Sequence, residues 1–286
     1  LVHRHVQPMV FLWEWPEIRL LLVAGIPMGL SAALEAFLIQ GGIILYRAGG
    51  ASDELVGNLG IILQAMVILA TVFGALARAA LPAISRSVDR GDSHHRLYLS
   101  GMIRIGFVFG TLAGIWAMAI GEDVLLFVLG SKYEPAAMGI RLMLWNLIPY
   151  IIMQACISSL VAQRRYAWLM WVSVSGAVTL TVAVMLLGSL HGISGVILGI
   201  LSGFCVSAVL ALVILYRLRL LDHVADVPKQ LAVLAVSLLV VTGLSDVHPW
   251  LAGLSATGVL FAGTMLLGVL RNNERSFLLG LLGRRR

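Results

Sequence analysis

The longest uncharged stretch of the sequence is residues 166–216, which contain no lysine, arginine, aspartate or glutamate. A helix needs about 20 apolar residues to cross a hydrocarbon core of about 30 Å, so this stretch is long enough for two crossings. Charged residues make up 12% of the chain, against about 25% in soluble domains. These features predict an all-α integral membrane protein.

Further apolar stretches divide the rest of the chain. Outer-membrane strands are excluded, because they would need about 10 residues of strict alternation. We expect a cytoplasmic segment at 1–17, a transmembrane bundle over 18–270 and a basic cytoplasmic tail at 271–286. The bundle is predicted to contain about eight transmembrane helices, at approximately 18–46, 54–85, 98–121, 135–162, 166–189, 192–216, 230–246 and 249–270.

Charge asymmetry predicts the orientation of these spans. If the N-terminus lies inside, most basic residues fall on the inner side. The only basic residues in the predicted outer loops are then Arg47 and Lys132. Cytoplasmic loops carry an excess of lysine and arginine, so we expect a multi-pass protein of the bacterial inner membrane with both termini cytoplasmic. The net charge of +6 is therefore attributed to inner loops and not to nucleic-acid binding.

Four ionisable residues fall within predicted spans. A charge at the bilayer centre costs at least about 2.5–3.5 kcal/mol on insertion scales, so such residues usually face a polar cavity or a partner. A Glu–Arg pair that only joins helices is the structural alternative. The four residues are Glu35, Arg78, Arg104 and Arg141.

Polar residues accompany these charges in a regular pattern. Gln64, Thr71 and Arg78 follow one another at heptad spacing, which places them on one helix face and predicts a water-filled interior. Asn146 and Gln154 lie deeper in the fourth span than Arg141. Since arginine binds phosphate bidentately, the excess of arginine favours an anionic ligand in a cavity lined by these residues together with Glu35 and Arg104.

Small residues recur every four positions in two spans, at Gly106, Gly110 and Gly114 and at Gly195, Gly199 and Gly203. In lipid this spacing lets helix backbones approach closely, so we expect tight helix packing at both faces.

The segment from Val124 to Leu129 is apolar but too short to cross a membrane, and Gly130 and Pro135 follow it. It is predicted to lie at the outer interface, either as a short helix or as an outward continuation of the third span, with Lys132 and Glu134 in water.

The sequence contains no glycine-rich phosphate loop, nucleophile elbow or zinc motif. We therefore expect a protein that is not an enzyme and that has no cofactor and no metal site.

Three stretches, "ALARAALPAISRSVDRGD", "DVLLFVLGSKYEPAAMGIRLMLWNLIP" and "HGISGVILGILSG", resemble polysaccharide-export flippases of the multidrug/oligosaccharidyl-lipid/polysaccharide exporter superfamily. The first is similar to a helix end with the pattern P-x-x-S. The second is similar to a G-x-x-Y turn before a helix with small residues and an arginine. In the third, two glycines match and two positions depart from alanine. The matching residues are Pro82, Ser85, Arg86, Gly130, Tyr133, Ala136, Ala137, Arg141, Gly192 and Gly195, and the departures are Val196 and Ile197.

The resemblance is to the second half of such flippases, so it implies the second lobe of a two-lobed bundle and the later part of a longer protein. It also implies transfer of an undecaprenyl-pyrophosphate-linked oligosaccharide across the inner membrane by alternating access. The implied partners are that lipid-linked oligosaccharide, membrane lipids and polysaccharide polymerase or assembly proteins. Three alternatives stay open: a multidrug or cation antiporter, a lipid II flippase, and a non-transporting fragment or scaffold in a polysaccharide assembly complex.

Overall fold

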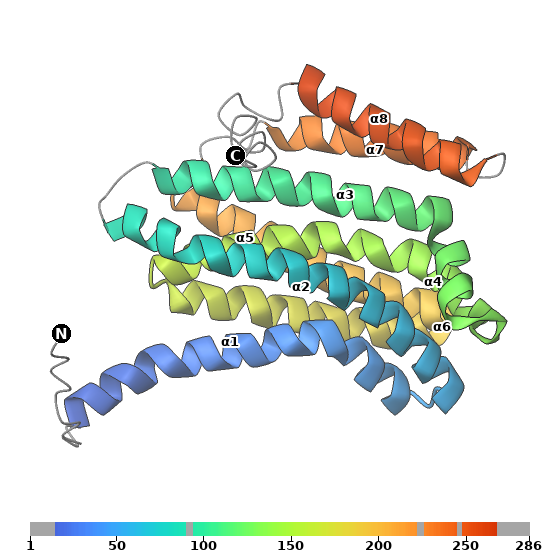
Figure 1. Cartoon of the computed structure of the whole chain (residues 1–286). Coiled ribbons are helices and arrows are strands. Elements are labelled where there is room, and N and C mark those ends of the chain that lie inside the picture. Colours follow the sequence, from blue (N-terminus) through green and yellow to red (C-terminus); the bar gives the residue numbers. More distant parts are fainter. Residues whose placement is uncertain (1–14, 90–93, 222–225, 245–247, 268–286) are drawn as a thin grey trace, which may run out of the picture.

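The computed structural model describes residues 15–89, 94–221, 226–244 and 248–267, and these residues contain helices and no strand. The basic tail predicted at 271–286 and most of the cytoplasmic segment predicted at 1–17 lie outside the described residues. The helices, shown side by side in Figure 1, are α1 (Trp15–Ala48), α2 (Asp53–Asp89), α3 (His94–Leu129), α4 (Glu134–Met143), α5 (Leu147–Ala162), α6 (Tyr166–Arg217), α7 (Asp226–Leu244) and α8 (Pro249–Leu266).

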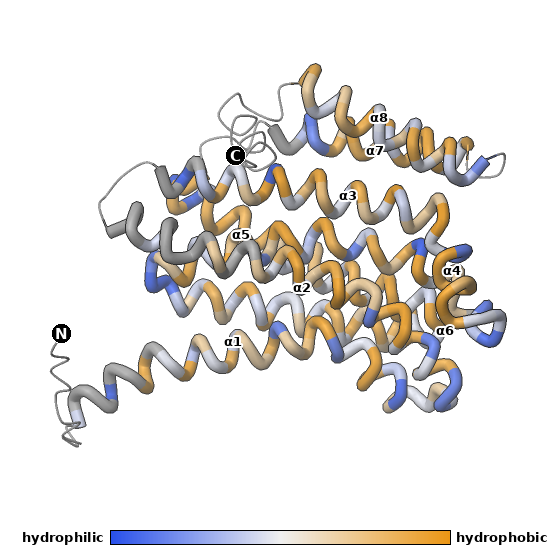
Figure 2. The backbone as a smooth tube through the Cα atoms, in the orientation of Figure 1, coloured by the Kyte–Doolittle hydropathy of each residue, from blue (hydrophilic) through white to orange (hydrophobic). Residues whose placement is uncertain are grey.

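Six helical segments of the described chain are long and apolar enough to cross a membrane. Figure 2 shows apolar residues along the helices and hydrophilic residues gathered mainly near the two ends of the bundle. This distribution is that of a multi-pass membrane protein. The helices of the described residues confirm the all-α class. The count of eight crossings stays a prediction. The apolar helix Pro228–Leu244 is shorter than the 18 residues required of a candidate span, and Tyr166–Arg217 is a single helical segment.

The predicted spans 166–189 and 192–216 form the two limbs of α6, which changes direction at Gly192. Gly192 has φ 58° and ψ −136°, a conformation that is strained for residues with a side chain. The two limbs on either side of Gly192 pack against each other. A Cβ at Gly199 would lie 2.8 Å from the Val184 nitrogen, and Ser207 Oγ donates a hydrogen bond to the Val172 carbonyl oxygen, 3.1 Å away.

The predicted close packing of the glycine faces is confirmed. On α3, a Cβ at Gly110 would lie 3.0 Å from the Ile148 nitrogen, and a Cβ at Gly114 would lie 2.8 Å from the Trp145 ring. These glycines therefore allow α3 to approach α5 and the turn before it.

The third span is longer than predicted. α3 continues to Leu129, so Glu122 and Asp123 are helical, although the sequence placed them in an outer loop. Of the two alternatives for 124–129, the continuation of the third helix is confirmed, and its outward direction stays a prediction. Gly130, with φ 86°, then ends the helix and precedes a short 3-10 turn, Ser131–Tyr133. Lys132 and Glu134 are exposed.

The fourth predicted span corresponds to one apolar helical segment, Ala136–Ala162, within which the type of helix changes. α4 ends at Met143 and α5 begins at Leu147, with a 3-10 turn, Leu144–Asn146, between them. The break lies before Pro149, which is in the first turn of α5. In the first turn of a helix the backbone N–H groups have no partner within the helix. The missing N–H of Pro149 therefore removes no hydrogen bond from α5.

The main core draws buried residues from all the helices α1 to α6, with fully buried residues such as Leu38, Met66, Leu147 and Phe204. α7 and α8 form an outer layer against α3 (Figure 1), around the buried residue Ile115. On the opposite side, α1 diverges from the bundle toward Trp15. α1 begins at Trp15, so residues 15–17 belong to it and not to the segment predicted to precede the first span.

Candidate functional site

Glu35 lies in the middle of α1 and is half-buried. Neighbouring positions fix this face of α1 against α6. Ser31 and Ser173 are hydrogen-bonded through their hydroxyls, 2.6 Å apart, and Leu38 is fully buried. Because α1 is held on both sides of Glu35, the carboxylate is directed along the edge of the core and not away from the bundle.

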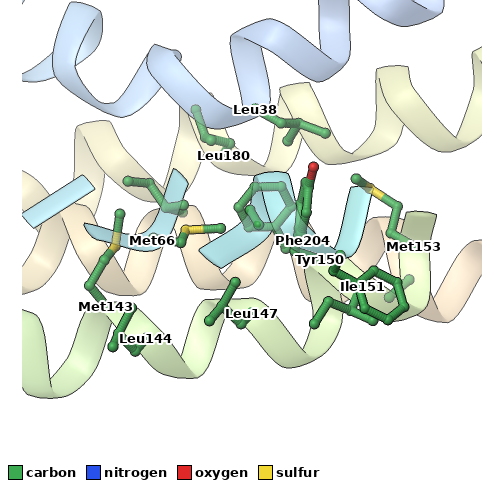
Figure 3. Packing of buried hydrophobic residues seen from close by; sticks show 14 of the residues in the cluster. Leu38, Met66, Met143, Leu144, Leu147, Tyr150, Ile151, Met153, Leu180 and Phe204 are labelled. Atoms are coloured by element: carbon green, nitrogen blue, oxygen red, sulfur yellow. The ribbon is translucent and has the colours of Figure 1, made fainter. Parts of the chain in front are cut away.

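Gln154 on α5 connects Glu35 to the core. Its side-chain nitrogen, Nε2, donates one hydrogen bond to Glu35 Oε1 and another to the Tyr150 hydroxyl oxygen, 3.1 Å away. Tyr150 is 6% exposed, and its ring packs edge-on against Phe204, with ring centroids 5.5 Å apart. Figure 3 shows the Tyr150 hydroxyl directed toward Leu38, which belongs to α1. The structure therefore joins a carboxylate, an amide and a phenol across α1 and α5.

Of the predicted site residues, the structure brings Glu35 and Gln154 together. Tyr150 was not among the site residues predicted from the sequence. Its position four residues before Gln154 was the available signal, because residues four apart share a helix face. A carboxylate with neighbouring oxygen and nitrogen groups can hold and release a proton or coordinate a small cation.

Asn146 lies in the 3-10 turn between α4 and α5 and is fully buried. Its Nδ2 atom donates to the Met143 carbonyl oxygen, 3.0 Å away. Its Oδ1 atom has no hydrogen-bond partner among the residues that the structure describes. A buried amide oxygen of this kind costs about 1–3 kcal/mol unless it is hydrated.

Arg141 on α4 forms an ion pair with α3, at the end of the bundle that the charge pattern predicts to be the outer one. Its Nη2 atom lies 2.8 Å from Oε2 of Glu122 on α3, and the two side chains are 44% and 35% exposed. From its place in the sequence, Arg141 could either line a cavity or extend to the membrane surface. The structure shows a half-exposed arginine whose charge is balanced by a neighbouring helix.

Arg104 lies on α3 and is only 3% exposed. Thr111, one heptad further along α3, is also fully buried. The side chain of Arg104 therefore lies within the protein.

The heptad stripe on α2 lies on the surface of the bundle. Gln64 and Thr71 are exposed, and Thr71 Oγ1 donates to the Val67 carbonyl oxygen of its own helix, 2.7 Å away. The side chain of Arg78 is outside the described part of the structure. Water contact along this stripe stays a prediction.

No protein-family model and no curated protein matches the sequence of this chain.

Proposed function

We propose that this chain is part of a transporter that moves an undecaprenyl-pyrophosphate-linked oligosaccharide across the bacterial inner membrane by alternating access. The resemblance described above gives the substrate class. The observation that supports transport is the half-buried Glu35, bound to Gln154 within an apolar helical bundle. Ionisable residues in such surroundings typically mark substrate or ion pathways.

In this proposal the basic residues contact the pyrophosphate. Arg78 and Arg141 are the first candidates, because guanidinium groups bind phosphate oxygens bidentately. Arg141 already pairs with Glu122, so it would have to leave that carboxylate to bind the anion. Glu35 is the coupling group, whose loading with a proton or cation changes the contact between α1 and α5. The N-terminus is assigned to the cytoplasmic side.

One observation favours a second candidate, a cation-coupled antiporter of the same superfamily. The carboxylate at Glu35 is bound to Gln154 within the spans, whereas the charge of Arg141 is balanced at the surface and Arg104 is the buried cation. An acidic interior group suits a cationic substrate better than an anionic one.

Complementation distinguishes the two candidates. The full reading frame is expressed in a strain that lacks its polysaccharide flippase, together with Arg78→Ala, Arg141→Ala and Glu35→Gln variants. Arg217→Ala, at an exposed position at the end of α6, is the matched control. We expect loss of surface polysaccharide with the first three variants and no loss with the control.

If both arginine variants restore polysaccharide as well as the unmodified chain, the anion contact is wrong. If drug resistance requires Glu35 while export requires neither arginine, the antiporter is the better assignment.

A further inference from the structure

A row of polar side chains follows one side of α5 and of the 3-10 turn before it, at a spacing of four residues. Its members are Asn146, Tyr150, Gln154 and Ser158. Residues four apart are neighbours on a helix surface, with Cβ atoms about 5–6 Å apart. We refer to these four residues as the α5 polar row.

Hydrogen bonds connect the last three residues of this row, Tyr150, Gln154 and Ser158. Gln154 Nε2 donates to the Tyr150 hydroxyl oxygen at 3.1 Å, and Ser158 Oγ donates to the Gln154 carbonyl oxygen at 2.9 Å. Glu35 joins the row from α1 through Gln154. Within the row, hydrogen bonds between side chains therefore connect Tyr150 and Gln154 to the Glu35 carboxylate.

The two ends of the row differ in burial. Asn146 and Tyr150 are buried, whereas Gln154 and Ser158 are partly exposed. Beyond Asn146 the chain continues into Leu144 and Met143, which are buried and apolar (Figure 3). In the other direction, Ser158 lies one turn from the end of α5 at Ala162.

Asn146 supplies an independent indication of a ligand. Its Oδ1 atom is fully buried and has no partner in the described part of the protein. Buried polar atoms in proteins are almost always satisfied by protein or by ordered water. A buried water typically makes about three hydrogen bonds, and adjacent members of the row present suitable groups.

We propose that the α5 polar row binds a file of water molecules that reaches Glu35 from the 163–165 end of the bundle and ends at Asn146. This inference rests on the proposed function and adds the route by which a proton reaches the coupling carboxylate. A hydronium ion in the file would give its proton to the Glu35 carboxylate and remain as water. Exchange with the opposite end is blocked by the apolar residues beyond Asn146.

Cysteine accessibility tests this proposal on the full chain in lipid nanodiscs. The background carries Cys156→Ala and Cys205→Ala, which replace the native cysteines. Asn146→Cys, Gln154→Cys and Ser158→Cys probe the row. Each has a matched control at the next residue, Leu147→Cys, Ala155→Cys and Ser159→Cys, where the side chains are buried. The probe is a charged methanethiosulfonate, and labelling is followed by mass spectrometry.

The reaction needs a thiolate, which forms in water and not in a dry apolar interior, so we expect Gln154→Cys and Ser158→Cys to react about tenfold or more faster than their controls. Asn146→Cys should react more slowly than these two variants but faster than Leu147→Cys. Equal rates within the three pairs would show that the row is dry and would overturn the proposal. All variants must react equally after denaturation and elute as single species beforehand.

This readout does not depend on transport. A hydrated row together with normal export by Glu35→Gln would contradict the coupling role in the proposed function and leave the water file intact. A dry row together with loss of export by Glu35→Gln would contradict the water file alone.

Discussion

Glu35 and Gln154 are hydrogen-bonded to each other across α1 and α5, although 119 residues separate them in the sequence. This contact joins a membrane-embedded carboxylate to the helix that also carries Tyr150 and Asn146. The same bond gives the bundle a polar connection where lipid supplies no hydrophobic driving force between helices.

Substituting Gln154 with alanine should destabilise the chain. The Glu35 carboxylate would lose a donor, and a hydrogen bond to a charged group contributes about 1.5–3 kcal/mol. We expect a lower Tm for Gln154→Ala in thermal unfolding of the purified chain in detergent. Gln64→Ala is the matched control, because Gln64 is exposed on α2 and its loss should change stability by less than about 0.5 kcal/mol. Equal Tm values for the two variants would show that the bond contributes nothing.

The packing of the two α6 limbs gives a second prediction. A Cβ at Gly195 would overlap the Leu187 carbonyl oxygen, which belongs to the backbone and cannot rotate away. Gly195→Ala should therefore lower the free energy of unfolding by about 1–3 kcal/mol or prevent folding. Gly258→Ala is the control, because nothing lies within 4 Å of its added Cβ. Yield of folded chain by size-exclusion chromatography, together with Tm, measures the difference. Comparable yield and Tm for both variants would mean that the limbs are not packed closely at this position.

The Arg141–Glu122 pair is half-exposed, so its coupling energy should be small. We expect a double-mutant cycle with Arg141→Gln and Glu122→Gln to give about 0.2–1 kcal/mol, decreasing with added salt. The exchanged variant, Arg141→Glu with Glu122→Arg, should recover most of the stability. If it recovers stability but not surface polysaccharide in complementation, Arg141 has a role beyond the ion pair. Recovery of both would assign it a structural role only.

The sequence predicted the helices better than their ends. Long apolar runs with few charges require helices in a membrane, because no water satisfies the backbone there. The ends depend on weaker local signals. Glu122 and Asp123 indicated a loop, yet α3 continues to Leu129, because the next conformational break in the chain is at Gly130. The break at Leu144–Asn146 had no proline or glycine within it, and hydropathy cannot detect a 3-10 turn inside an apolar run.

By itself, the sequence determined the all-α class, the apolar segments and the helix faces on which glycines allow close approach, because these follow from composition and from the period of the helix. Only the tertiary structure decided which polar groups meet. It paired Glu35 with Gln154 and Arg141 with Glu122, buried Arg104, and left Gln64 on the surface. Helical periodicity gives the direction of a side chain around its own axis, whereas its partner depends on how the helices pack against one another.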